Sequence, residues 1–143
     1  MDEIQNHIVE LLKSGHAHDN FLTVASRFTE PLINKKVPGQ GYTTWHLIEH
    51  IRIGQKDIID YVIGTNYKEL AWPKDFWPAL DKKAAFADWK KTIDEYEKDL
   101  VTLTELIRKQ NNVSVLKKAL LVVDHTSYHV GELSLTLTAL KKK

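Results

Sequence analysis

Hydrophobic residues recur every three or four positions along most of this chain, which is the spacing of amphipathic helices that bury one face. The most regular run lies between residues 86 and 107, where apolar side chains alternate at intervals of three and four. It comprises Phe86, Trp89, Ile93, Tyr96, Leu100, Leu103 and Ile107. The run predicts one helix of a helical bundle, with Asp81 as its N-terminal cap and residues 110–112 as its end.

The same spacing predicts three further bundle helices, at residues 19–31, 43–64 and 115–140. The capping residues expected for them are Asp19, Thr43 or Thr44, and Ser114. Pro31 and Gly64 are expected to end the first two of these helices. A short extra helix at residues 4–12 precedes them and is expected to stop at Gly15. The predicted fold is all-α: a four-helix bundle with an added N-terminal helix, forming a single domain over residues 1–143.

An aromatic and proline-rich segment separates the second and third bundle helices. It contains Tyr67, Trp72, Pro73, Phe76, Trp77 and Pro78. Because aromatic side chains bury large areas, we expect this loop to be ordered. It either covers one end of the bundle, which is the interpretation that we adopt, or forms the wall of a ligand pocket.

The last predicted helix is apolar on two sides. One stripe comprises Leu116, Leu120, Val123, Ser127, Val130 and Leu137, and the other comprises Val122, His125, His129, Leu133 and Thr136. If the stripe with the histidines faces the bundle axis, neighbouring helices or a second subunit must cover the other stripe. We therefore expect a homodimer, with Leu120, Val123 and Val130 at its interface.

Composition narrows the functional classes. The chain has 143 residues, 43% of them hydrophobic, which suits one compact domain with its own core. Lys and Arg number 20 against 19 Asp and Glu, so the sequence lacks the basic excess of a nucleic-acid-binding surface. No apolar run approaches the roughly 18 residues of a membrane span, and the N-terminus is acidic where a signal peptide is basic. We expect a cytoplasmic protein without nucleic-acid or membrane partners.

Two pairs of histidines carry the candidate chemistry. His125 and His129 are four residues apart on a predicted helix, as are His46 and His50, so each pair lies on one helical face. One such pair arises often by chance, but two pairs among only 7 histidines favour a metal site. The chain has no cysteine, so imidazole and oxygen would have to supply the ligands. The alternative for His50 is a half-buried side chain bonded to a backbone carbonyl, although Gly54 leaves room beside it that this alternative does not need.

His16 and His18 stand at the start of the first bundle helix. Loop histidines usually face solvent. Otherwise these two would line the metal site from its open end, with residues 15–18 shaping access to it.

Three motifs, in order, resemble the DinB-like (DinB/YfiT) superfamily of metal-binding four-helix bundles. They are Trp45–Ile58 (WHLIEHIRIGQKDI), Trp72–Pro78 (WPKDFWP) and Asp124–Glu132 (DHTSYHVGE). The match extends over residues 11–140. This resemblance implies that His50, His125 and His129 bind the metal and that His46, at a variable position of the motif, does not.

The resemblance also implies a reaction class. Three neutral imidazoles leave coordination positions open, as catalytic metal sites do. Zinc or nickel is the expected ion, with manganese and iron as alternatives. Characterised relatives include thiol transferases and an isomerase, so a small-molecule ligand such as a thiol is expected. Glu132, where the family has Gln, could bond a ligand of the metal, bind the metal or stay at the surface, and it is the candidate base.

Three functions stay open at this point. The first is a metal-dependent enzyme of the thiol S-transferase or hydrolytic type. The second is a non-catalytic metal or small-ligand binding protein of the stress response. The third is an all-helical scaffold with incidental histidines. The family's arginine on the last helix is absent, since residues 135–140 carry no basic side chain, and this weakens the case for an anionic thiol substrate.

Overall fold

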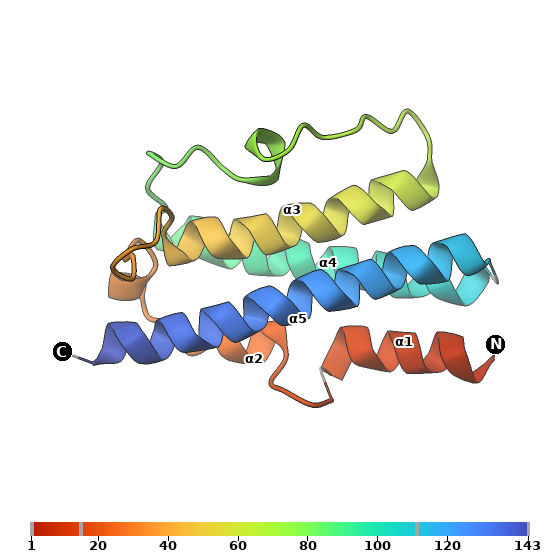
Figure 1. The fold of residues 1–143 in the computed structure, drawn as a ribbon, viewed down its shortest axis with the longest axis horizontal. Coiled ribbons are helices and arrows are strands. Elements are labelled where there is room, and N and C mark those ends of the chain that lie inside the picture. The colour runs from red at the N-terminus through yellow and green to blue at the C-terminus, as the bar shows by residue number, and fades with distance from the viewer. Residues whose placement is uncertain (1, 15, 111, 143) are drawn as a thin grey trace.

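The computed structural model describes residues 2–14, 16–110 and 112–142, and these form five α-helices and two short 3₁₀ helices (Figure 1). The elements are α1 (Glu3–Ser14), α2 (Phe21–Ala25), η1 (Glu30–Leu32), α3 (Thr44–Ile63), η2 (Lys74–Phe76), α4 (Phe86–Lys109) and α5 (Val113–Lys141). The all-α class is thereby confirmed. The helix end expected at Gly15 lies outside the described residues.

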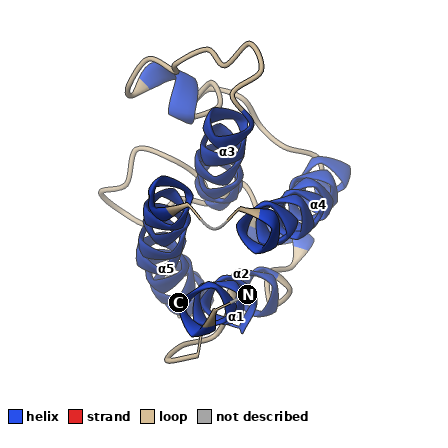
Figure 2. Ribbon diagram, turned by 90° about the vertical axis from the view of Figure 1, so that its right-hand side faces the viewer, coloured by secondary structure: helices blue, strands red, loops and turns tan. Residues whose placement is uncertain are grey.

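The long helices α3, α4 and α5 surround a common core that α1 and α2 close from the fourth side (Figure 2). Helices α3 and α4 run in the same direction, whereas α5 runs against them, with α1 and α2 end to end beside it (Figure 1). Because α3 and α4 are parallel, the chain must return along the whole length of α3 between them. Residues 64–85 make this crossover on the outer side of α3. The aromatic loop therefore lies along the flank of α3, not over an end of the bundle.

Helix α3 has both of the ends that its sequence predicts. Thr43 Oγ1 accepts a hydrogen bond from the backbone N–H of His46 at 3.2 Å, and Gly64 ends the helix with a φ of 76°. Glycine adopts this left-handed backbone conformation without the steric cost that a side chain would add. These two caps fix the register of the helix and with it the direction of the His50 side chain.

Three helix starts differ from the prediction, and one of them is that of α5, which begins at Val113 with Asn112, not Ser114, as its cap. Helix α4 begins at Phe86, not after Asp81, and the Asp88 carboxylate accepts a hydrogen bond from the Ala85 N–H at 2.8 Å. Helix α2 is capped by Asn20, not by Asp19, and ends at Ala25, well before Pro31. Pro31 instead stands in the first turn of η1. A capping side chain can act from either side of a helix start, so several polar residues nearby make the start ambiguous in the sequence.

The two apolar stripes of α5 face different neighbours. Val122, Leu133 and Thr136 of the stripe that carries the histidines are buried in the core. On the other stripe, Val130 is only 2% exposed because α1 and α2 cover it, whereas Leu120 is 46% exposed. Helix α1 is thus part of the core packing. The described residues contain no helix long and apolar enough to cross a membrane.

Candidate metal centre

Three histidine rings converge between α3 and α5. The Nε2 atom of His50 lies 3.0 Å from His125 Nε2 and 3.2 Å from His129 Nε2. One nitrogen from each ring lies within 4.8 Å of the other two, and the group is one that could hold a metal ion. Nitrogens bound to one tetrahedral zinc ion would be roughly 3.3 Å apart, given zinc to nitrogen bonds of about 2.0–2.1 Å. The observed spacing already approaches that value.

Hydrogen bonds at the far side of two rings set their tautomers. His50 Nδ1–H donates to the Phe76 carbonyl at 2.7 Å, and His129 Nδ1–H donates to Glu132 Oε1 at 2.8 Å. With the proton on Nδ1, the Nε2 atom of each neutral ring carries a lone pair. Two lone pairs therefore face each other between His50 and His129, an arrangement that a cation between them would stabilise. The donor set thus fits a divalent metal, and the outer hydrogen bonds resemble those of metal-binding histidines in general.

Burial lowers the pKa of two of these rings and so favours their neutral form, which is the form that binds a cation. Desolvation, reinforced by the neighbouring His129 and His50 rings, lowers the pKa of His125 to about 4. Desolvation also lowers the pKa of His50, although its bond to the Phe76 carbonyl acts in the opposite direction. Both rings are therefore neutral near pH 7, as a metal ligand must be.

Gly54 makes room for the His125 ring. A Cβ atom at position 54 would lie 2.8 Å from His125 Cε1 and 3.0 Å from His125 Nδ1, closer than side-chain atoms normally approach. Gly54 stands one helical turn after His50 on the same face of α3. The missing side chain lets α5 bring its histidine against α3, so the room that the sequence indicated beside His50 is filled by His125.

Glu132 is held in a polar network beside His129. Its Oε1 accepts the His129 proton, while Oε2 accepts hydrogen bonds from the Tyr42 hydroxyl and from Gln40 Nε2, the latter at 3.1 Å. Burial and the nearby Glu132 carboxylate raise the pKa of the Tyr42 phenol, which keeps it a donor. Of the roles considered for Glu132, these contacts favour orienting His129. A role as base stays a prediction.

The crossover packs directly on the site. The Trp77 ring stacks on His50 with centroids 3.9 Å apart and planes at 5°, and it also stacks on Tyr42 at 4.7 Å. Together with the Phe76 carbonyl, this fixes His50 from two sides. Sequence reasoning gave no role to Tyr42 or Gln40, which precede α3 in an irregular stretch. Trp77 belongs to a motif of the resemblance, and that was the available signal for its place at the site.

His46 lies apart from the three rings and has a structural role. It is 0% exposed, its Nδ1 accepts the Thr43 N–H at 2.9 Å, and its Nε2–H donates to the Lys82 carbonyl at 2.9 Å. Both nitrogens are thus engaged at the N-terminus of α3. Burial lowers the pKa of His46, consistent with a neutral ring.

The structure does not bring His16 or His18 to the three rings. His16 Nε2 lies 3.4 Å from a Glu10 carboxylate oxygen, and its ring lies beside that of His7. His18 hydrogen-bonds the Ser127 hydroxyl at 3.1 Å, on the side of α5 that faces away from His125 and His129. The contacts of His16 and His18 therefore do not support an access route to the three rings past these residues. Gly15 itself lies outside the described residues.

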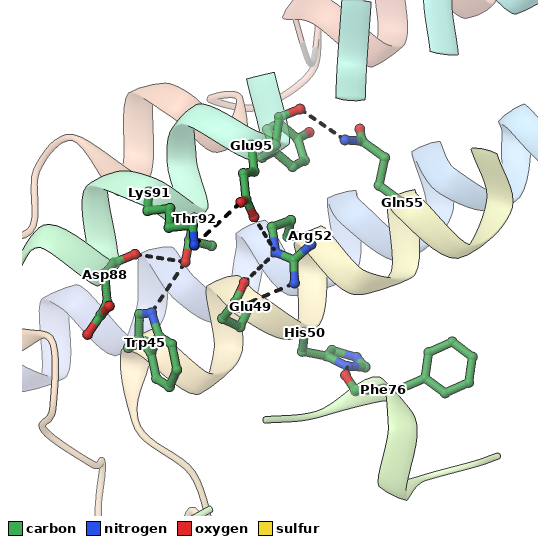
Figure 3. A network of polar contacts seen from close by, with 11 residues as sticks. Trp45, Glu49, His50, Arg52, Gln55, Phe76, Asp88, Lys91, Thr92 and Glu95 are labelled. Atoms are coloured by element: carbon green, nitrogen blue, oxygen red, sulfur yellow. Dashed lines mark hydrogen bonds and ion pairs between the residues drawn. The ribbon is translucent and has the colours of Figure 1, made fainter. Parts of the chain in front are cut away.

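A polar network on the opposite face of α3 holds this helix against α4 (Figure 3). Arg52 pairs with Glu49 within α3 and with Glu95 of α4, the latter at 3.6 Å. Nearby, Gln55 Nε2 donates to the Tyr96 carbonyl at 3.0 Å. His50 points the other way, toward Phe76, as the figure shows. His50 thus lies on a helix that is fixed from behind, which keeps the direction of its side chain rigid.

Comparison of the chain with family models, with curated proteins and with solved structures found no match.

Proposed function

We propose that this protein binds a divalent transition metal through His50, His125 and His129 and acts as a metal-dependent enzyme on a small molecule. One observation carries the proposal. The Nε2 atoms of His50 and His129 lie 3.2 Å apart with their lone pairs facing each other, because the Nδ1 protons are donated to the Phe76 carbonyl and to Glu132. A divalent cation between the two neutral rings would relieve this repulsion. Neutral imidazoles suit zinc or nickel, with manganese and iron as the alternatives.

A divalent ion held by three imidazoles can act as a Lewis acid and lower the pKa of a coordinated water or thiol. The protein's own residues would fix the ligand geometry. Glu132 and the Phe76 carbonyl orient His129 and His50, and Trp77 shields one face of His50 from water. Three ligands leave positions for a substrate, which is the arrangement of catalytic sites and not of closed structural sites. Hydrolysis and thiol transfer are the two reactions that this arrangement supports.

The three motifs that resemble the DinB-like superfamily support the same proposal, because that resemblance selects the same three histidines. We propose membership on this basis and a four-helix-bundle description of the fold, with α1 and α2 sharing one position. A non-catalytic metal or small-ligand binder of the stress response would share the metal centre but leave the open positions without a reaction.

Metal content tests the site. His50→Ala, His125→Ala and His129→Ala should each lose most of the zinc or nickel that the wild-type protein takes up, because two remaining imidazoles bind weakly. His46→Ala should keep it, with circular dichroism confirming the helical fold of every variant. Retention of full metal by the three single variants would exclude the proposed site. Equal losses for His46→Ala and His50→Ala would mean that His46 is a ligand instead.

Reactivity then separates an enzyme from a binder. The cobalt-loaded protein should change its visible absorption when thiols, azide or carboxylates are added, since these anions can fill an open position. Hydrolysis and thiol-transfer assays with zinc, nickel or manganese should show turnover that the three histidine variants lack. Metal binding without spectral change or turnover would favour the binder.

A further inference from the structure

A cavity of about 290 Å³ borders His125 between α3, α5 and the crossover. Its apolar walls include Ile58 of α3, Leu121 of α5 and the Trp72 and Phe76 rings of the crossover. An adjoining hollow of about 510 Å³ shares Trp72 and Phe76 with it. The cavity is large enough for a small organic molecule and reaches one of the three proposed metal ligands.

The charges that line this cavity are negative. Asp57 and Asp124 contribute carboxylates from α3 and α5, and no Lys or Arg is among its described lining residues. Within the described part of the chain, neither carboxylate forms an ion pair, and Asp57 accepts a hydrogen bond from the Tyr67 hydroxyl at 2.9 Å. The adjoining hollow adds Glu69 and Lys118, and the Lys118 Nζ lies over the Tyr61 ring. In the metal-free protein these carboxylates would repel an anion that enters the cavity and attract a cation, whereas a divalent ion on the histidines would offer an anion a ligand position of its own.

Aromatic surface stands next to these carboxylates. Trp72 is 71% exposed, which is unusual for so large an apolar ring, and its centroid lies 5.6 Å from that of Phe76 and 6.4 Å from that of His50. The face of an exposed indole attracts organic cations, most strongly where a ligand also loses water. Trp72 therefore offers a recognition surface over the mouth of the cavity, beside the histidines.

We infer that this cavity binds a small organic cation, an amine or quaternary ammonium compound with an apolar body, and holds it beside the histidine centre. Asp57 and Asp124 would neutralise the charge, Trp72 would cover the cationic group, and Ile58 and Leu121 would contact the apolar part. The inference deepens the proposed function and rests on it for the reaction, since it names the substrate class that the open metal positions would meet. A thiol whose body carries negative charges is disfavoured by the same carboxylates.

Three probes of similar shape test the charge preference: benzyltrimethylammonium, benzyl alcohol and benzenesulfonate. The first has no lone pair with which to bind a metal, so its affinity reports on the cavity alone. Binding is measured by tryptophan fluorescence and calorimetry on the full chain, both metal-free and zinc-loaded. In the metal-free protein the cation should bind at least about fivefold more tightly than the alcohol, and the sulfonate should bind most weakly. Equal affinities, preference for the sulfonate or no binding of the cation would overturn the inference.

Variants locate the binding site. Asp57→Asn and Asp124→Asn should each weaken the cation about threefold to fivefold and leave benzyl alcohol unaffected, while Trp72→Leu should weaken the cation by a similar factor. Asp94→Asn, on the exposed face of α4, is the matched control and should change nothing. An unchanged cation affinity in the Asp57→Asn, Asp124→Asn double variant would exclude this cavity. Zinc uptake by the wild-type protein, measured in parallel, tests the proposed metal function separately, so the two failures are distinguishable.

Discussion

Gly54 decides how closely the His125 ring can approach α3. Replacing it with Ala would place a Cβ 2.8 Å from His125 Cε1, so the ring has to turn or α5 has to move. We expect Gly54→Ala to weaken zinc binding by roughly tenfold or more, because an imidazole displaced by a few tenths of an ångström no longer points at the shared ion. Chelator competition measures the affinity.

Gly131→Ala is the matched control for that substitution. Gly131 also lies in a helix, between His129 and Glu132, but a Cβ there meets nothing within 4 Å. Zinc affinity should stay unchanged, and the free energy of unfolding should rise by about 0.5–1 kcal/mol from the better helix propensity of alanine. If both variants bind zinc like the wild type, close packing at Gly54 does not control the site.

Spacing alone could place histidines on one face of a helix, but it could not choose between His46 and His50. Helical periodicity is satisfied by either member of an i, i+4 pair. The choice depends on what else each ring contacts, and those contacts come from the Thr43 cap, from Lys82 and from Phe76. The sequence did hold one local signal, since His46 is the third residue of a helix that Thr43 caps, a position whose side chain can bond back to the cap.

At the scale of elements, the ranges of α3 and α5 came close to their predicted ones because the apolar spacing runs through both helices, although Asn112 caps α5 in place of Ser114. The start of α4 did not, since Asp81 and Asp88 are both plausible capping residues and only Asp88 contacts the backbone at the first turn. The path of the crossover could not be predicted from the sequence either. It depends on α3 and α4 being parallel, a property of the whole chain that local periodicity does not encode.

His46 joins the start of α3 to the end of the crossover, so its removal should loosen both. His46→Ala leaves the Thr43 N–H and the Lys82 carbonyl without their partners in a buried place. We expect a loss of about 2–4 kcal/mol in the free energy of unfolding, measured by urea denaturation. His46→Gln, which keeps an acceptor and a donor, should lose less. Equal losses in the two variants would mean that packing, not hydrogen bonding, is the role of His46.

For the whole molecule, the homodimer stays a prediction, and fewer of its expected interface residues are now available to form it. The second stripe of α5 is covered at Val130 by α1 and α2 within one chain, so Leu120 is the test position that still faces outward. A homodimer through Leu120 should appear in light scattering at micromolar concentration and dissociate in Leu120→Lys. A wild-type monomer under these conditions would rule out the dimer.

The buried histidines should make the stability of the metal-free protein depend on pH. His125 has a pKa of about 4 in the folded chain, against an ordinary value of 6.5 that the unfolded chain recovers. Between these values the unfolded state binds more protons than the folded state, so the free energy of unfolding falls as the pH falls. The slope for His125 cannot exceed about 1.4 kcal/mol per pH unit, and His50, whose pKa is lowered as well, adds in the same direction. Above pH 7 these groups contribute no further change, because both are neutral in either state.

Urea denaturation from pH 4 to 8 should therefore show stability rising to about pH 6.5 and levelling off, with a shallower rise in His125→Gln. A slope in that variant equal to the wild-type slope would assign the pH dependence to other groups.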